Sequence, residues 1–105
     1  MPYVPDRGDI VWLDFNPQAG RRPALVLSPT AYNTKVGLAI FCPVTNQVKG
    51  YPFEVAIPES QKVSGVILSD QVKSLDWRKR NVDFITSLAV ETVGEVVAKL
   101  RTLLP

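Results

Sequence analysis

Short apolar segments, separated by proline, glycine and asparagine, make up most of the chain. Between Asp9 and Phe15 the side chains alternate between two faces, with Val11 and Leu13 on one face and Trp12 on the other, which is the period of a β-strand. The other segments are rich in β-branched and aromatic residues and end at turn-forming residues. We predict strands at 9–15, 24–28, 38–44, 53–57, 65–69 and 82–85, with turns at 16–20, 32–35, 49–52 and 57–60.

The period changes after Leu88, where apolar residues begin to recur at spacings of three and four, as on one face of an α-helix. Thr86 or Ser87 is expected to cap this helix. The segment 71–77 is too polar for a strand, and we predict a short helical turn or a loop there. The fold class is therefore mainly β, a small, strongly curved, barrel-like antiparallel sheet of about six strands with a C-terminal α-helix. The apolar helix positions are Val90, Val93, Val96, Val97, Leu100, Leu103 and Leu104.

The size and composition of the chain restrict what it can be. Its 105 residues fit one domain, 1–105, and 46% hydrophobic with 21% charged residues is ordinary globular composition. The net charge of +2 permits a nucleic-acid partner without requiring one. No apolar run approaches the roughly 20 residues of a membrane span, and the N-terminus lacks a signal pattern. We therefore expect a cytoplasmic protein with no membrane contact.

The chain has no histidine and one cysteine, Cys42. This excludes zinc fingers, Ser-His-Asp and Cys-His catalysis, and an intramolecular disulfide. Cys42 falls in the middle of a predicted strand, which is typical of a small buried hydrophobic residue. The carboxylates are scattered and do not form the spacing of a metal site. We expect neither a metal nor another cofactor.

Two polar stretches follow or open predicted strands. Arg21 and Arg22 stand at the mouth of the second strand, and paired guanidinium groups suit phosphate, although a solvated loop with charged ends explains them equally. The stretch 45–49, after the third strand, combines a hydroxyl, two amides and an ammonium group. Such donors suit phosphates and base edges, and the alternative is an ordinary asparagine-containing turn.

The densest basic run surrounds an aromatic residue. Lys73 and the segment 78–80 are basic, and Trp77 lies between them. Aromatic rings interleaved with cations can bind single-stranded nucleic acid, and the alternative is that Trp77 is a buried anchor or a dimer contact. Four more aromatic side chains would stack on bases if exposed, but at strand spacing they more often belong to the core: Phe15, Tyr32, Tyr51 and Phe53.

Four stretches of the chain carry motifs whose combination is specific. They are VPDRGDIVWLDF at 4–15 with Pro17 and Gly20, RPALVLS at 22–28 with Tyr32 and Asn33, PVTNQVKGYPFE at 43–54, and GVILSDQVKSLDWR at 65–78. Together they resemble the MazF/PemK (Kid-like) family of toxin endoribonucleases, the mRNA interferases of toxin–antitoxin systems. The resemblance covers nearly the whole chain except the C-terminal helix. One departure is a Glu-Gln-x-Gly stretch that relatives carry before their Arg-Arg-Pro segment and that is missing here.

The resemblance implies an SH3-like barrel that forms a homodimer and cleaves single-stranded mRNA at short sequences without a metal. It also implies inhibition by a cognate antitoxin protein, whose acidic, disordered tail would cover the basic groove. The family's catalytic arginine, which precedes the proline of an Arg-Pro motif, falls on Arg22. Its catalytic threonine, after the third strand, falls on Thr45, and its lysine before a Trp-Arg pair falls on Lys73. The segment 75–77 is a natural dimer contact.

Cleavage without histidine is chemically reasonable, because the ribose 2′-hydroxyl can attack the adjacent phosphorus and leave a 2′,3′-cyclic phosphate and a 5′-hydroxyl. Arg22 would hold the phosphate oxygens as they gain charge, and Thr45 would donate its hydroxyl to the same phosphate. The general base is either Arg22 acting weakly or a loop carboxylate. Bases would be recognised by amides and by stacking, and cations would neutralise the backbone. The predicted substrate-binding residues are Phe15, Arg21, Asn33, Asn46, Gln47, Lys49 and Lys73.

Two other functions compete with RNA cleavage. CcdB-type gyrase poisons are similar in fold and act through an exposed aromatic residue at the end of the C-terminal helix. The tail 99–105 contains no aromatic residue, which favours RNA as the target. A non-catalytic RNA-binding module would bind RNA with a steep salt dependence and leave its length unchanged.

Overall fold

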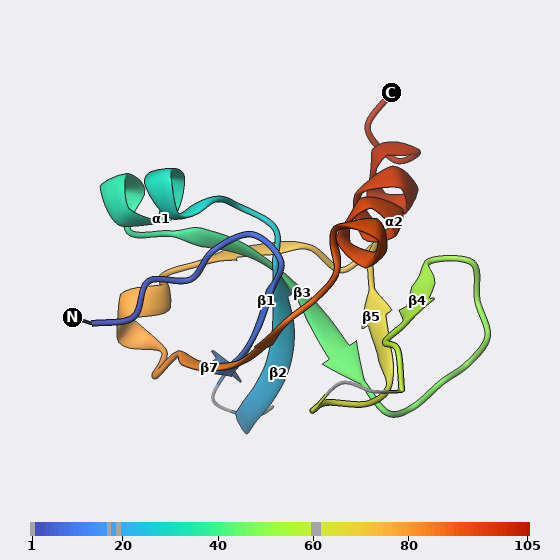
Figure 1. Ribbon diagram of the computed structural model, residues 1–105, viewed down its shortest axis with the longest axis horizontal. Helices are drawn as coiled ribbons and strands as arrows, with labels where there is room; N and C mark the ends of the chain where they lie inside the picture. The colour runs from blue at the N-terminus through green and yellow to red at the C-terminus, as the bar shows by residue number, and fades with distance from the viewer. Residues whose placement is uncertain (1, 17, 19, 60–61) are drawn as a thin grey trace.

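The computed structural model describes residues 2–16, 18, 20–59 and 62–105. It confirms a mainly β fold with a C-terminal helix, and each of the six predicted strands is present (Figure 1). The predicted turns at 16–20 and 57–60 include residues 17, 19 and 60, which lie outside the described residues. The strands are β1 (Asp9–Asn16), β2 (Gly20–Val26), β3 (Ala39–Thr45), β4 (Glu54–Ala56), β5 (Val66–Leu68), β6 (Lys73–Leu75) and β7 (Asp83–Ser87); the helices are α1 (Thr30–Val36), α2 (Val90–Arg101) and the 3-10 helix η1 (Trp77–Lys79).

One antiparallel sheet contains the strands in the order β4-β5-β3-β2-β1-β7, and β6 also pairs with β3. Along one of its edges, strand β3 pairs with two different strands, one after the other. Its first half pairs with β6, where Ile40 lies opposite Ser74, and its end pairs with β5, where Thr45 lies opposite Val66. The strand order of the described residues is open, because β4 and β7 stand at its two ends. The end of β3 is thus the place where the two parts of the sheet separate.

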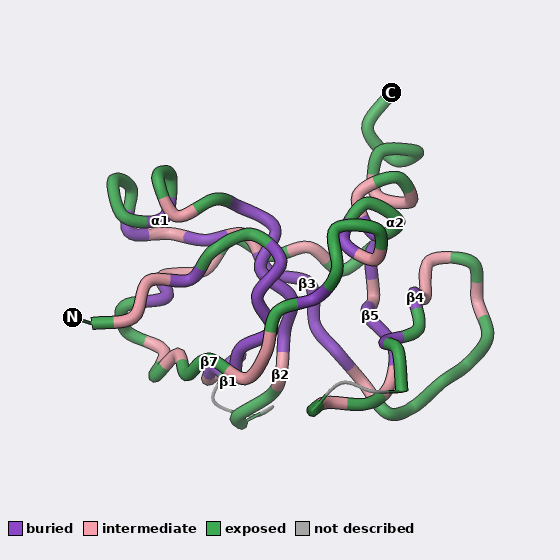
Figure 2. Tube along the Cα trace, in the orientation of Figure 1, coloured by how far each residue is buried: buried purple, intermediate pink, exposed green. Residues whose placement is uncertain are grey.

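The alternation predicted for β1 separates two hydrophobic clusters. Ile10 faces the cluster under α2, whereas Val11 and Leu13 face the cluster that contains Phe41 and Trp77. Complete burial of such side chains contributes about 1.5–3 kcal/mol each. Figure 2 shows that the buried stretches concentrate where β1, β2 and β3 cross. The two clusters therefore hold β2 and β3 rigidly on both faces, and the candidate site lies at the ends of these strands.

Two elements differ from the prediction. The segment predicted as a helical turn contains a strand, β6, and the 3-10 turn follows it at Trp77–Lys79. Strand β6 tolerates polar residues because Lys73 and Ser74 are exposed on it. Helix α1 occupies the predicted turn at 32–35, and Asn33 is its buried residue. A helix without an apolar stripe leaves no period in the sequence to detect.

The start of α2 also differs from the prediction. Its N-cap is Ala89, without a side-chain cap. Ser87 belongs to β7 instead, and its hydroxyl donates a hydrogen bond to Asp9 at 3.1 Å. Neither α1 nor α2, nor any other helix in the described part of the chain, is long and apolar enough to cross a membrane.

Candidate functional site

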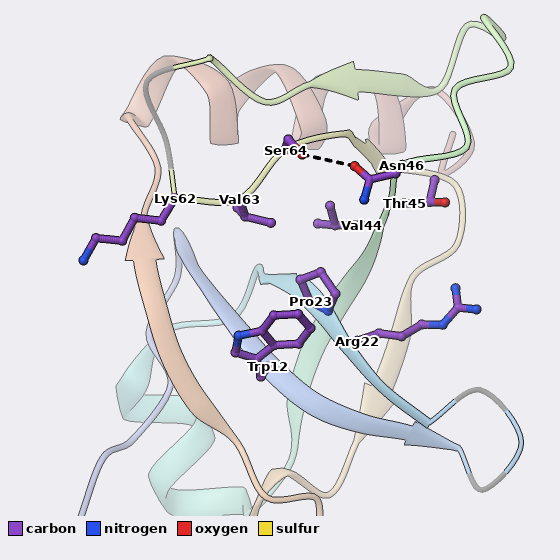
Figure 3. Close-up of a pocket in the computed structure, with 9 residues that line it drawn as sticks. All are labelled: Trp12, Arg22, Pro23, Val44, Thr45, Asn46, Lys62, Val63 and Ser64. Carbon is purple, nitrogen blue, oxygen red and sulfur yellow. Dashed lines mark hydrogen bonds between the residues drawn. The ribbon is translucent and has the colours of Figure 1, made fainter.

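Arg22 and Thr45 lie together on one face of the sheet. Arg22 is on β2 and Thr45 ends the neighbouring strand β3, which pairs with β2 from Ala24 to Val26. Both side chains line three adjoining pockets, of about 380, 210 and 170 Å³. Figure 3 shows that the two side chains extend to the same side. We call these three pockets the Arg22–Thr45 groove.

The two adjacent arginines have different surroundings because successive side chains on a strand point to opposite faces. Arg21 donates to the backbone oxygen of Asn81 at 2.7 Å and forms an ion pair with Asp83. A second carboxylate, that of Asp14, lies 3.8 Å away. Arg21 lines none of the three pockets, so its predicted contact with substrate is not supported by its position. Arg22 is the arginine that faces the groove.

The Thr45 hydroxyl is oriented by the turn that follows it. Its oxygen accepts a hydrogen bond from the backbone N–H of Gln47 at 3.1 Å. A hydroxyl group has one proton to donate, and this contact occupies an acceptor position instead. The geometry therefore leaves the Thr45 proton for an acceptor in the groove, which is the arrangement that a phosphate oxygen requires.

A carboxylate organises the loop after Thr45. Glu54 accepts hydrogen bonds from the backbone N–H groups of Lys49 and Gly50, each at 2.9 Å. Gln47 and Lys49, both predicted to bind substrate, line the 170 Å³ pocket of the groove. Glu54 thus fixes the backbone from which the Lys49 side chain extends, and Thr45 holds that of Gln47.

The 380 Å³ pocket combines an apolar floor with an amide. Trp12, Pro23, Val44 and Val63 gather around its centre (Figure 3). Ser64 donates to the Oδ1 atom of Asn46 at 3.2 Å, and the Asn46 nitrogen points away from Ser64. Asn46 therefore presents a donor beside Arg22 and Thr45, as the predicted contact with a base requires.

The 210 Å³ pocket contains Lys73 and Phe15, both predicted to bind substrate. The Lys73 ammonium lies 5.2 Å from the centroid of the Phe15 ring, a cation–π distance. Phe15 is only 6% exposed and packs in the cluster of Phe41 and Trp77. Its ring shapes the pocket but does not offer the open face that the predicted base stacking needs.

Asn33 is not a base-reading residue in this structure. It is fully buried in α1, although the sequence analysis placed it at the substrate. Its Nδ2 donates to the carbonyl oxygens of Pro5 and Ser28 at 2.8 and 3.0 Å, and its Oδ1 accepts from the Ser28 hydroxyl at 2.6 Å. The amide is used to join the N-terminal segment to α1, so its conspicuous polarity in the sequence has a structural cause.

Within the basic run, Trp77, Arg78 and Arg80 have structural roles. Trp77 is 9% exposed, and its indole N–H donates to the Asn33 carbonyl. The Arg78 guanidinium donates to the Thr34 carbonyl at 2.6 Å, and that of Arg80 donates to the Asp14 carbonyl at 3.0 Å. The burial and hydrogen bond of Trp77 agree with the buried-anchor alternative, and the dimer contact of the segment 75–77 stays a prediction.

Several residues that line the groove were not predicted from the sequence. The hydroxyl of Tyr51 donates to Asp70 at 2.9 Å, and partial burial together with this bond raises the pKa of Tyr51. Gln71 lines two of the three pockets. Each is a single polar residue near a strand end. Ordinary turns contain the same kind of residue, so the sequence alone does not indicate a functional role. Tyr51 was expected from the sequence only as a base-stacking residue if exposed. The groove residues without a sequence-based prediction of function include Trp12, Glu54, Lys62, Ser64 and Gln71.

Comparison with known proteins gives consistent matches over the full chain. Residues 6–104 match the family described as PemK-like, MazF-like toxin of type II toxin-antitoxin system. The chain is 48% identical over 107 residues to the endoribonuclease toxin MazF of Escherichia coli K12, which covers 97% of this chain and 96% of that protein. It is 36% identical to the endoribonuclease toxin ChpB of the same strain, over 91% of this chain and 90% of that protein.

Solved structures give the same result. The crystal structure of MazF (Form-I) from Deinococcus radiodurans is similar with a TM-score of 0.93 and 53% identity, over 98% of both chains. A MazE-MazF crystal structure (Form-II) from the same organism is similar with a TM-score of 0.92 and 52% identity, over 98% of this chain and 97% of that one.

Proposed function

The chain belongs to the PemK-like, MazF-like toxin family of type II toxin–antitoxin systems, and we propose on that premise that it is an endoribonuclease that cuts single-stranded mRNA at short sequences without a metal. Its relatives at 48% and 36% identity are named endoribonuclease toxins. The observation that carries the proposal for this chain is that Arg22 and Thr45, from neighbouring strands, line the same groove.

Arg22 is proposed to stabilise the phosphate as negative charge develops on it. A guanidinium group offers paired N–H donors that match two phosphate oxygens, and it carries its positive charge throughout the physiological pH range. The groove places this cation beside the Thr45 hydroxyl. The chemical step is attack of the ribose 2′-hydroxyl on phosphorus, which forms the O2′–P bond and breaks the P–O5′ bond. The 2′-hydroxyl loses its proton and the leaving 5′-oxygen gains one, so the products are a 2′,3′-cyclic phosphate and a 5′-hydroxyl.

Thr45 is proposed to donate its hydroxyl proton to the same phosphate. The hydrogen bond from Gln47 N–H to its oxygen fixes the side chain before substrate binds. A preoriented donor needs no reorganisation as charge develops, so it lowers the barrier more than a mobile one.

The surrounding side chains are proposed to bind the rest of the RNA. Lys49 and Lys73 line two different pockets of the groove, each together with Arg22, and suit the backbone phosphates. Asn46 and Gln47 present amides to base edges, which RNA-binding proteins recognise in splayed single strands. A single strand therefore fits the groove, because its bases are free to contact these amides.

The partner and the assembly are also proposals. A similar MazF, from Deinococcus radiodurans, has been crystallised together with MazE. For this chain we propose a cognate antitoxin whose acidic, disordered tail covers the cationic side chains of the groove. We infer a cytoplasmic homodimer of one-domain chains. Sedimentation of the purified protein measures the homodimer directly.

A cleavage assay tests the proposal. The substrate is a fluorogenic DNA/RNA chimera, incubated with EDTA, and the enzymes are the wild type, Arg22→Ala and Thr45→Ala. Removal of one charge-stabilising donor should lower the rate about 100-fold or more. Replacement of the scissile ribonucleotide by a deoxynucleotide should stop cleavage, since the nucleophile is then missing.

Arg101→Ala and Thr34→Ala are matched controls, because both residues are exposed and lie outside the groove. They should cleave as the wild type does. Wild-type rates for both Arg22→Ala and Thr45→Ala would show that the chemistry occurs elsewhere. Intact RNA with all proteins would favour a binding module or a gyrase poison.

A further inference from the structure

Gly65 is packed against the backbone of Thr45. Its φ of +114° lies in a region that side chains rarely adopt. A Cβ atom at Gly65 would lie 2.3 Å from the carbonyl oxygen of Thr45 and 2.9 Å from the Oδ1 atom of Asn46. A normal carbon–oxygen contact is about 3.3 Å, so even one methyl group has no room.

The segment that contains Gly65 cannot move away from Thr45 easily, because it is bonded on its other side. The carbonyl of Gly65 accepts a hydrogen bond from Ile57 N–H at 3.0 Å. The next residue, Val66, pairs with Thr45 on one side and with Ala56 on the other. Thr45 is partly exposed at the end of its strand. A methyl group would therefore displace Thr45 and Asn46 rather than the segment around Gly65.

We propose that Gly65 is a positioning residue for RNA cleavage: it lacks a side chain so that the Thr45–Asn46 backbone can sit where the Thr45 hydroxyl meets the phosphate held by Arg22. This inference rests on the proposed function. Gly65 touches no substrate and acts through Thr45. Ser64 supports the same placement from the adjacent position, through its hydrogen bond to Asn46.

The expected effect of Gly65→Ala follows from the distance. The contact must open from 2.3 Å to about 3.3 Å, a shift of about 1 Å. Misplacement of a catalytic group by about 1 Å can lower a rate about 100-fold. The kcat should therefore fall about 100-fold, while KM rises by a smaller factor, because Asn46 is displaced with Thr45 but Lys49 and Lys73 are not.

Gly8→Ala is the matched control. Gly8 also has a positive φ, +95°, so alanine there has similar backbone strain. Its Cβ would meet Val93 Cγ2 at 3.6 Å and Leu88 O at 3.8 Å, which are ordinary contacts far from the groove. Gly8→Ala should lower the melting temperature and leave kcat unchanged.

A double-mutant cycle separates positioning from general destabilisation. Cleavage rates of Gly65→Ala, Thr45→Ala and the double variant are measured below the melting temperature of the least stable protein. If Gly65 acts through Thr45, the double variant is about as slow as Thr45→Ala alone, because a missing hydroxyl cannot be misplaced. Full additivity, about 10,000-fold, would overturn the inference, as would a wild-type kcat for Gly65→Ala.

The cycle also distinguishes this inference from the proposed function. A wild-type rate for Thr45→Ala would refute the role of Thr45 itself. A slow Thr45→Ala with an unaffected Gly65→Ala would refute only the positioning role. Ser64→Ala is the second variant, because it removes the hydrogen bond to Asn46 without adding an atom beside Thr45; it should lower kcat in the same direction as Gly65→Ala. If Gly65→Ala does not fold and Ser64→Ala cleaves as the wild type does, the contact serves the fold rather than the rate, and the inference is wrong.

Discussion

The indole N–H of Trp77 donates a hydrogen bond to the backbone carbonyl of Asn33 at 3.0 Å. Both residues are buried, and they come from segments 44 positions apart. Each stands out in the sequence as a possible contact for RNA, yet they hold each other in the interior. This pair joins η1 to α1, so we expect substitutions here to affect stability rather than cleavage.

Asn33→Ala should destabilise the protein strongly. It removes three buried hydrogen bonds, two to the Pro5 and Ser28 carbonyls and one from the Ser28 hydroxyl, and each such bond contributes about 0.5–1.5 kcal/mol. We expect a loss of about 2–4 kcal/mol in the free energy of unfolding, measured by urea denaturation. The kcat of the folded fraction should equal that of the wild type. If the variant were as stable as the wild type but cleaved RNA more slowly, Asn33 would contact the substrate as the sequence predicted.

Glu54→Ala should raise KM with little change in kcat. The carboxylate accepts N–H groups from Lys49 and Gly50, so its loss frees the loop that carries Gln47 and Lys49. One such bond corresponds to about tenfold in binding. The assay is run at high ionic strength, where the loss of a negative charge near RNA matters little. Glu91→Ala, on the exposed side of α2, is the control, and equal KM values for the two variants would contradict the role of Glu54.

Lys73→Ala should weaken the salt dependence of RNA binding. Each phosphate that a lysine neutralises contributes about 0.7 to the slope of log K against log salt for single strands. Titration of an RNA with a deoxynucleotide at the scissile position measures binding without cleavage. Lys79→Ala removes the same charge from the exposed 3-10 helix, outside the groove, and should leave the slope unchanged. Identical slopes for both variants would show that Lys73 does not neutralise a phosphate of the bound RNA.

The Asp6 carboxylate should stabilise the protein at neutral pH and not in acid. It accepts N–H groups from Thr30 at 3.0 Å, at the start of α1, and from Arg7 at 2.9 Å. The Thr30 bond is the main reason that the pKa of Asp6 lies below its usual value. A lowered pKa gives stability that is present above the unfolded value of about 3.9 and lost as the pH falls through the folded value. The melting temperatures of the wild type and Asp6→Asn should therefore differ at neutral pH and converge in acid.

Cys42 should not react with thiol reagents in the native protein. It is fully buried, and burial, with a smaller effect of the Asp70 charge, raises its pKa to about 12. The thiolate is the reactive form, so modification at pH 8 requires unfolding. Ellman's reagent should react only as urea unfolds the chain. Rapid reaction of the native protein would show that the sheet opens at β3.

The strands could be predicted from the sequence because each is limited by turn residues and carries β-branched or aromatic side chains. Strand β6 and helix α1 could not, since their residues have neither a period nor enough apolar character. Lys73 and Ser74 become a strand because β3 offers an unpaired edge to them. Such elements depend on tertiary pairing, which a local pattern does not contain.

Only part of the candidate site could be predicted, because some of its features also depend on tertiary structure. Arg22 and Thr45 stand at strand ends, and the resemblance to a known family identified both. The difference between Arg21 and Arg22, the burial of Asn33 and the close contact of Gly65 depend on which face each residue occupies. These relationships involve residues from distant parts of the chain, such as Asp83 beside Arg21.

The irregularity in the β1–β2 pairing between Asp14 and Asn16 separates the first hairpin from the register of the two strands. Adjacent positions on a strand face opposite sides of the sheet. If β2 shifted by one residue along β1, Arg21 would therefore take the place of Arg22 beside Thr45. A bulge absorbs an extra residue without passing such a shift along the strand. A change in the length of the first hairpin beyond this bulge would therefore leave the pairing of Leu13 with Arg22 unchanged, and Arg22 would keep its orientation toward the groove.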